Sequence, residues 1–223
     1  MKDYKIVSEL SSKDKKVFKV ESEGVFYILK EYPDETAKTK EVLAVGKIAL
    51  TGYAPQVIEH EGNKAVYEYI EGENLHDAFR NATMLDDKQT MQLLATRLAI
   101  FLQIIYSFTD CVMKEIDFKN YVIKDGRIIG VDFSSVDNGM PYEDVASAIS
   151  YALVNSVGEY YDSYPFIDKL LECSRLKLID IINEISASLK KRKEKSRDGK
   201  DVEMMLDTLT QFQENGVDWH KLI

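Results

Sequence analysis

The chain has 223 residues, a length that suits one or two domains with a packed core. It carries 29 Lys and Arg against 38 Asp and Glu, and this net charge of -9 disfavours an extended nucleic-acid-binding surface. The three histidines, His60, His76 and His220, are far apart in the sequence. Composition therefore gives little support to a Ser-His-Asp or Cys-His mechanism, or to a histidine-rich metal site.

The two cysteines, Cys111 and Cys173, do not form a CxxC pair. We interpret them as buried free thiols in a reducing compartment. No apolar run reaches membrane-spanning length, and the N-terminal segment lacks the apolar core of a signal peptide. We therefore expect a cytoplasmic protein with no membrane or nucleic-acid partner, and the sequence leaves its oligomeric state open.

The first thirty residues have the pattern of a β-meander. Polar and apolar residues alternate over residues 5–10 and 16–20, and a dense apolar run over residues 25–30 ends in Lys30. Turn-forming residues separate the three segments, including Glu23-Gly24. A lysine at a strand end often only improves solubility and blocks strand pairing, so Lys30 by itself does not indicate a site.

A helix and two further strands follow. Residues 36–50 carry an apolar stripe with Glu41 at its edge, which predicts an amphipathic helix. Residues 55–58 and 65–69 predict two strands around the turn Glu61-Gly62-Asn63. The N-terminal part is therefore expected to be a five-stranded sheet with one helix inserted after the third strand.

The segment Glu71-Gly72-Glu73-Asn74 breaks this pattern and marks a boundary between residues 1–70 and residues 71–223. Nearly all of the second part is predicted to be helical. Its expected helices are residues 75–80, 87–108, 144–154, 163–173, 176–191 and 202–215. The charge run at residues 190–197 is interpreted as a solvated helix end and linker.

Residues 113–133 hold two groups of acidic and amide side chains, namely Glu115, Asp117 and Asn120 in the first and Asp132 in the second. Between them, Asp125-Gly126 predicts a tight hairpin with strands at residues 121–123 and 127–131. The hairpin would hold Asn120 and Asp132 at adjacent strand ends. An amide oxygen and a carboxylate are hard ligands suited to Mg²⁺, and phosphate-transfer sites take their remaining ligands from the nucleotide.

The order of these segments resembles the protein-kinase-like superfamily, in particular the aminoglycoside- and choline-phosphotransferase branch and the minimal bacterial and archaeal kinases. The resemblance covers most of the chain except its C-terminal segment. It implies an α+β, two-lobed fold, with a small antiparallel β-sheet N-lobe that has one helix and a mainly helical C-lobe. Residues 1–70 would then form the nucleotide-binding lobe, and residues 71–223 the helical lobe with the catalytic loop and metal site.

The resemblance also implies roles for particular residues. Lys30 corresponds to the lysine that grips the α- and β-phosphates, and Glu41 to the helix glutamate that pairs with it, with Glu35 as a weaker candidate. Glu68-Tyr69-Ile70 resembles the hinge whose backbone binds adenine. The ATP and Mg²⁺ cofactors are implied in the same way.

In the second lobe, Asn120 and Asp132 match the two Mg²⁺ ligands, although an aspartate at a strand end can also simply cap a turn. Asp144 matches a buried aspartate that braces the catalytic loop, and it can equally act as a first-turn or N-cap residue of its helix. Both roles of Asp144 are compatible.

The catalytic base has two candidates. In protein kinases this loop has the motif H-R-D-x-x-x-x-N. When the asparagine of the motif is aligned with Asn120 without a gap, the catalytic aspartate of the motif falls on Glu115. A loop two residues shorter would make Asp117 the base instead. A glutamate has one methylene more than the family's aspartate, and a misplaced base can reduce the rate by about 10²-fold.

Two further departures affect the function. The first hairpin turn, SSKDKK, has no glycine, so Ser11, Ser12 or its lysines can contact phosphate in place of backbone amides. Only a short segment separates Asp132 from Asp144, which leaves no room for a long activation loop. A small-molecule substrate or an unusual acceptor is therefore expected rather than a peptide.

Three functional hypotheses follow. The first is an ATP- and Mg²⁺-dependent phosphotransferase, a kinase that moves the γ-phosphate to a hydroxyl of a small molecule. The second is a pseudokinase, a nucleotide-binding regulatory or scaffolding module without phosphotransfer. The third is an α+β protein unrelated to kinases.

Overall fold

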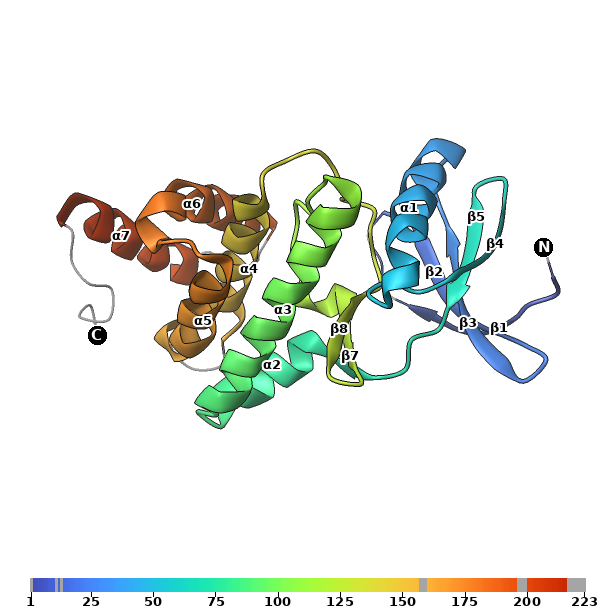
Figure 1. The fold of residues 1–223 in the computed structure, drawn as a ribbon, viewed down its shortest axis with the longest axis horizontal. Coiled ribbons are helices and arrows are strands. Elements are labelled where there is room, and N and C mark those ends of the chain that lie inside the picture. The colour runs from blue at the N-terminus through green and yellow to red at the C-terminus, as the bar shows by residue number, and fades with distance from the viewer. Residues whose placement is uncertain (1, 11, 13, 157–159, 196–199, 216–223) are drawn as a thin grey trace.

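The computed structural model describes residues 2–10, 12, 14–156, 160–195 and 200–215. Ser11 and Lys13, which belong to the first hairpin turn, lie outside the described residues, and so does the end of the charge run. The chain forms a sheet-containing part and a helical part that lie end to end (Figure 1). We call them the N-lobe, from β1 to β5, and the C-lobe, from β6 to α7.

The N-lobe is a five-stranded antiparallel sheet with strand order β1-β2-β3-β5-β4 and one long helix. Its elements are β1 (Lys5–Leu10), β2 (Lys16–Ser22), β3 (Val25–Glu31), α1 (Glu35–Ile48), the 3-10 turn Ala49–Thr51, β4 (Val57–Glu61) and β5 (Lys64–Glu68). Helix α1 contacts β4 and β5 on one side and α3 of the C-lobe on the other. The predicted sheet, with its helix inserted after the third strand, is confirmed, and β4 and β5 lie closer to their shared turn than expected.

The C-lobe is mainly helical (Figure 1). Its elements are β6 (Glu73–Asn74), α2 (Leu75–Met84), α3 (Lys88–Thr109), the 3-10 turn Phe118–Asn120, β7 (Tyr121–Lys124), β8 (Arg127–Gly130), α4 (Pro141–Asn155), the 3-10 turn Tyr160–Ser163, α5 (Tyr164–Ser174), α6 (Leu178–Lys195) and α7 (Lys200–Asn215). Helix α2 extends beyond the predicted residues 75–80, because Ala82 and Thr83 are buried and no stop signal precedes them. The α+β fold class is confirmed.

Helix α3 is the centre of the C-lobe. The six apolar positions expected on its inner face are all buried: Met91, Leu94, Leu98, Phe101, Leu102 and Ile105. It contacts α1, α2, α4, α5 and β8. By length and composition alone, α3 is apolar enough to cross a membrane, so the expectation that no segment reaches that length was wrong. Its apolarity follows from packing on many sides.

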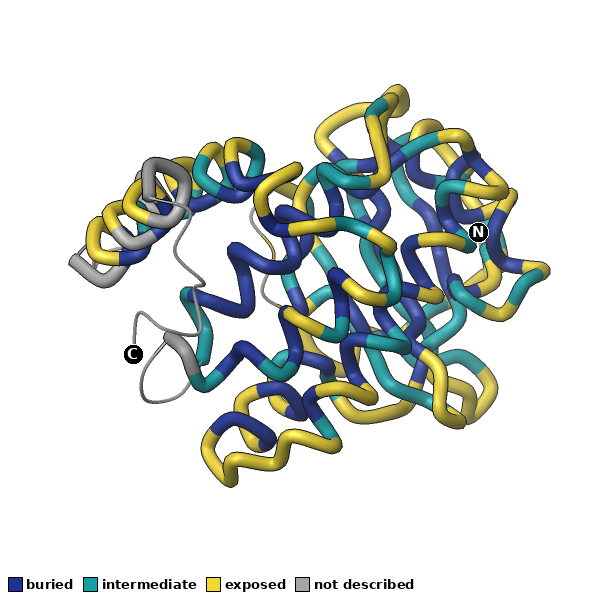
Figure 2. Tube along the Cα trace, turned by 60° about the vertical axis from the view of Figure 1, so that its left-hand side comes forward, coloured by how far each residue is buried: buried dark blue, intermediate teal, exposed yellow. Residues whose placement is uncertain are grey.

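The tube coloured by burial shows the same arrangement (Figure 2): buried stretches lie toward the inside of the molecule, and exposed ones lie on turns and on the outer faces of helices. Helix α4 is the most enclosed, since every residue from Asp144 to Leu153 is buried. Cys111 and Cys173 are free thiols, and both are only partly buried. The prediction that both cysteines are free thiols is confirmed. The prediction that they are buried is not confirmed, since both are partly accessible.

The predicted hairpin is present as β7 and β8, and its turn residues Asp125 and Gly126 have φ values of 50° and 75°. Two positive φ values are typical of a type I′ turn. Gly130 at the end of β8 allows close packing, because a Cβ there would lie 2.8 Å from Phe133 and 2.9 Å from Phe101. This packing fixes the strand end that precedes Asp132.

Candidate functional site

Lys30 and Glu41 form a buried ion pair between the sheet and helix α1. The exposed fraction is 4% for Lys30 and 0% for Glu41. Lys30 Nζ lies 2.5 Å from Glu41 Oε1 and donates to the carbonyl oxygen of Val131 at 2.8 Å. Because β3 is an inner strand between β2 and β5, the interpretation of Lys30 as an edge lysine is excluded. The weaker candidate Glu35 is exposed and lies 3.5 Å from Lys38.

A second lysine enters the same cluster. Lys15, which precedes β2, lies 2.8 Å from Glu41 Oε2 and 2.7 Å from Asp132 Oδ1. Glu41 also accepts a hydrogen bond from the backbone N–H of Phe133 at 3.2 Å. Lys15, Lys30, Glu41 and Asp132 therefore form one cluster of two cations and two anions, which we call the charge cluster. The lysines of the first turn were expected near phosphate, but nothing in the sequence indicated a contact with Asp132.

The charge cluster keeps Asp132 ionised. Burial by itself raises the pKa of Asp132, but Lys30, Lys15 and the backbone N–H of Ser134 hold it well below its usual range. The hydrogen bonds found for this carboxylate within the described residues, from Lys15 and Ser134, all go to Oδ1. The second oxygen of Asp132 is therefore available to a cation.

Asn120 is joined to the residue before Asp132 through the backbone, since the N–H of Val131 donates to the Asn120 carbonyl at 2.9 Å. Within the described residues, no three His, Cys, Asp or Glu side chains gather as a metal cage. One carboxylate and one amide suit a hard divalent cation that takes its remaining ligands from water and phosphate. The donor set of Asn120 and Asp132 therefore fits the implied Mg²⁺ ion.

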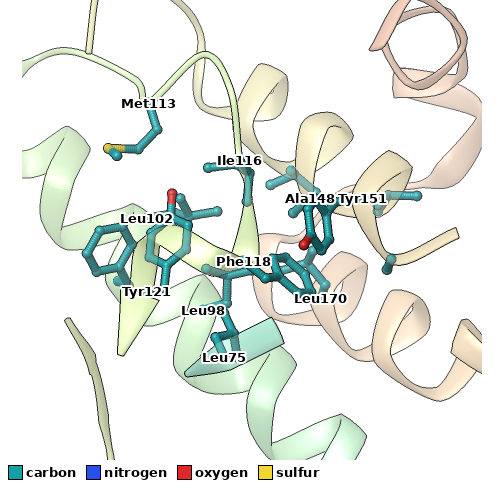
Figure 3. Close-up of a cluster of buried hydrophobic side chains, with 14 of the residues drawn as sticks. Leu75, Leu98, Leu102, Met113, Ile116, Phe118, Tyr121, Ala148, Tyr151 and Leu170 are labelled. Carbon is teal, nitrogen blue, oxygen red and sulfur yellow. The ribbon is translucent and has the colours of Figure 1, made fainter. Parts of the chain in front are cut away.

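The loop before Asn120 alternates between buried and accessible residues. Met113, Ile116 and Phe118 are buried. In Figure 3, Ile116 and Phe118 lie among Leu98 of α3, Ala148 and Tyr151 of α4, and Leu170 of α5, whereas Met113 lies on the side of Leu102 and Tyr121. Between the three buried loop residues, Glu115 is exposed and Asp117 is half-buried. Asp117 accepts a hydrogen bond from the N–H of Lys119 at 3.0 Å, which caps the 3-10 turn. The apolar residues thus anchor the loop and leave both candidate bases near its surface.

Helix α4 holds the backbone of this loop. Asp144 accepts hydrogen bonds from the N–H groups of Met113 at 2.8 Å and Lys114 at 2.9 Å. The Ser147 hydroxyl accepts one from the N–H of Ile116 at 2.9 Å. Glu115 is therefore bracketed by anchored residues on both sides. Asp144 combines the two roles considered for it, because it also lies in the first turn of α4.

Arg192 of α6 holds the loop through hydrogen bonds, a role that was not predicted from the sequence. Its Nη2 donates to the carbonyl oxygens of Ile116 at 2.7 Å and Ser147 at 3.0 Å, and its guanidinium lies 5.0 Å from the ring centre of Tyr151. The interpretation of residues 190–197 as wholly solvated was therefore wrong at this position. The available signal was spacing, since the buried Ile185 and Leu189 continue at helical intervals to Arg192.

The expected hinge connects the lobes. Strand β5 ends at Glu68, whose N–H donates to the carbonyl of Gln56 at 2.9 Å. The backbone of Tyr69 and Ile70 lies beyond the strand ladder, and Ile70 is buried. A Cβ on the following Gly72 would lie 2.4 Å from the Ile123 carbonyl oxygen, so only glycine allows this close crossing.

The buried carboxyl group of Asp144 should make the stability of the protein depend on pH. Burial raises its pKa from 3.8 to about 7, against the two backbone N–H groups that favour the carboxylate. Because the folded state holds this proton more tightly than the unfolded state, the resulting stabilisation is complete below pH 3.8 and is lost as the pH rises to 7.

We therefore expect the free energy of unfolding of the wild type to fall, relative to Asp144→Asn, by on the order of a few kcal/mol between pH 4 and pH 7. Urea unfolding of both proteins across this range measures the difference. Parallel pH profiles would contradict the expectation.

Comparison with known proteins identifies the fold. Neither a family model nor a curated sequence matches the chain. A structure of the amicoumacin kinase hAmiN in complex with AMP-PNP, Ca²⁺ and Ami matches with a TM-score of 0.57 and 15% identity, over 97% of this chain and 91% of that one. The kinase PK-1 of Cydia pomonella granulovirus matches with a TM-score of 0.48 and 13% identity, over 60% of this chain. The match spans 55% of the viral kinase.

At these identities the similarity defines the fold and nothing finer. The chain has a protein-kinase-like fold, and its structural relatives include a small-molecule kinase. The hypothesis of an α+β protein unrelated to kinases in fold is thereby excluded.

Proposed function

We propose that the protein is an ATP-dependent phosphotransferase that moves the γ-phosphate to a hydroxyl of a small-molecule acceptor. The observation that carries this proposal is the charge cluster, which brings Lys30, Glu41 and Asp132 together at the junction of the lobes. A buried lysine needs a counter-charge to remain protonated and in place. Glu41 supplies it, and the ammonium is then held ready for phosphate.

The other residues take roles that their positions support. The backbone of Glu68, Tyr69 and Ile70 would bind the adenine, and Asn120 and Asp132 would hold a divalent cation, for which we propose Mg²⁺. When bound, that ion would neutralise charge on the phosphates. Catalysis would then rest on positioning and charge stabilisation rather than on covalent chemistry.

A small acceptor is favoured by the segment between β8 and α4. Val112 and Asp137 exchange two backbone hydrogen bonds of 2.9 and 3.0 Å, which hold this short segment against the loop before Glu115. A peptide acceptor would lack an extended activation loop on which to lie. The similarity in fold to a kinase named for amicoumacin supports the same choice. We place the activity in the cytoplasm, without a nucleic-acid or membrane partner.

The proposal is tested by nucleotide binding followed by transfer. Thermal unfolding is measured with ATP, ADP and adenosine, each with and without Mg²⁺, because a ligand at 100 times its Kd stabilises the folded state by about 2.7 kcal/mol. Transfer of labelled γ-phosphate to a panel of hydroxylated metabolites and antibiotics follows. Stabilisation with transfer supports the proposal, whereas stabilisation without transfer favours the pseudokinase. The absence of any stabilisation would overturn both.

Replacement of the two candidate bases separates their roles. We expect Glu115→Gln to reduce transfer by about 10²- to 10³-fold, because general-base catalysis contributes about 10²- to 10⁴-fold. Glu115 is favoured since the residues on either side of it are anchored by Asp144 and Ser147. Asp117→Asn should instead leave transfer and stability close to those of the wild type, because the asparagine amide oxygen can still accept the turn hydrogen bond from the N–H of Lys119. Steady-state kinetics and ATP affinity of both variants show which residue is the base. A greater loss of transfer in Asp117→Asn than in Glu115→Gln would assign that role to Asp117.

A further inference from the structure

Lys15 is a second buried lysine at the proposed phosphate site. It directly precedes β2, at the end of the turn that closes the first hairpin, and its side chain is only 4% exposed. Its ammonium group pairs with both carboxylates of the charge cluster and lies 5.3 Å from the ring centre of Tyr32. The turn is thereby attached to Asp132, which lies 117 positions away in the sequence.

The contact between Lys15 and Asp132 is an ion pair at the carboxylate that would hold the metal. Lys30 pairs directly with Glu41, so of the two lysines it is Lys15 that forms the direct ion pair with Asp132. A divalent ion on Asp132 would place two further positive charges beside the same ammonium group, and like charges at such short range repel strongly. Lys15 and the metal therefore compete for one carboxylate unless an anion compensates both.

The nucleotide supplies such an anion. Glycine-rich turns above a phosphate site bind through backbone N–H groups, which requires close approach of the backbone. The turn at residues 11–15 contains no glycine, yet Lys15 brings a charged donor from it into the site. A lysine ammonium group is an effective phosphate ligand as a point charge.

We propose that Lys15 is a second phosphate-binding lysine: it neutralises Asp132 in the nucleotide-free protein and pairs with the nucleotide's terminal phosphates when Asp132 holds the metal. This inference rests on the proposed function and adds a residue to its site. The inference predicts that replacing Lys15 changes two affinities in opposite directions. Loss of Lys15 weakens the binding of polyphosphate and strengthens the binding of a metal ion in the absence of nucleotide.

The test uses Lys15→Met, which keeps much of the alkyl stem, and Lys5→Met as the matched control. Lys5 is an exposed lysine of β1 and lies outside the turn, so the control removes the same charge away from the cluster. Calorimetry gives the affinities for ATP, ADP and adenosine with Mg²⁺, and electron paramagnetic resonance gives the affinity for Mn²⁺ alone.

For Lys15→Met we expect ATP affinity to fall by about 10- to 100-fold, the usual range for a charge-assisted hydrogen bond, with adenosine affinity unchanged. Mn²⁺ affinity without nucleotide should rise, and Lys15→Arg should restore most of the ATP affinity. Lys5→Met should match the wild type in all measurements. If methionine prevents folding, Lys15→Gln takes its place with the same expected changes.

Equal ATP affinity in Lys15→Met and the wild type would overturn the inference while leaving the proposed function intact. So would a fall in Mn²⁺ affinity, which would indicate that Lys15 only maintains the structure of the cluster. A wild type that binds no nucleotide would overturn the proposed function itself. The two failures are therefore distinguishable.

Discussion

Asp132→Asn should reduce phosphate transfer by roughly 10³-fold, the range expected when a charged group that stabilises transferring phosphate is removed. Asparagine keeps the shape of the side chain and an acceptor for Ser134, but it removes the negative charge that Lys15 and the divalent cation would share. The low pKa of Asp132 means that the wild-type carboxylate remains ionised at physiological pH. Initial rates with the acceptor identified from the panel, at saturating ATP, measure the loss.

A matched control for this substitution is available in the same segment. Asp137 is 60% exposed and pairs with Lys40 at 3.4 Å, outside the charge cluster. Asp137→Asn should leave transfer within about twofold of the wild type, as is usual for an exposed ion pair. If Asp132→Asn retained a tenth or more of the wild-type rate, Asp132 would not be the metal ligand that the proposed function requires.

Glu41→Leu should destabilise the protein by about 3–5 kcal/mol, the range observed when one partner of a buried ion pair is removed. Glu41 is completely buried and accepts from Lys15, Lys30 and the Phe133 backbone. Its removal leaves Lys30 without a carboxylate partner among those contacts. Urea unfolding at pH 7, monitored by circular dichroism, gives the change in the free energy of unfolding.

The double substitution Lys30→Met/Glu41→Leu tests the reason for that loss. Replacing both charges with apolar groups of similar size removes the unpaired cation, while Lys15 keeps Asp132 as its partner. The double variant should therefore recover most of the stability lost by Glu41→Leu. Glu172→Ala is the second control, and because Glu172 is exposed and its partner Lys169 is also accessible, it should change stability by less than about 0.5 kcal/mol. A double variant no more stable than Glu41→Leu would show that packing, not charge, explains the loss.

The sequence alone was sufficient for the elements and their order. Periodicity located α3 through its buried face, and the Asp125-Gly126 pair located the hairpin whose strand ends hold Asn120 and Asp132. These features are local. The hydrophobic periodicity of a strand or helix can be recognised from neighbouring residues, and a type I′ turn needs particular residues at two positions. The ion pair of Lys30 with Glu41 was predicted only because the order of segments resembled a known superfamily.

Tertiary structure decided which charges meet. Lys15 and Asp132 are separated by 117 positions in the sequence, and Arg192 and Ile116 by 76 positions, and neither pair belongs to a shared repeat. Such contacts depend on where the fold places each side chain, and pattern analysis treats an isolated lysine or arginine as solvated because that is its usual state. Burial reverses this preference when carboxylates or carbonyl oxygens are within reach, since an unpaired buried charge is costly. Periodicity and turn chemistry thus determined the scaffold, whereas three-dimensional packing determined the charge cluster at its centre.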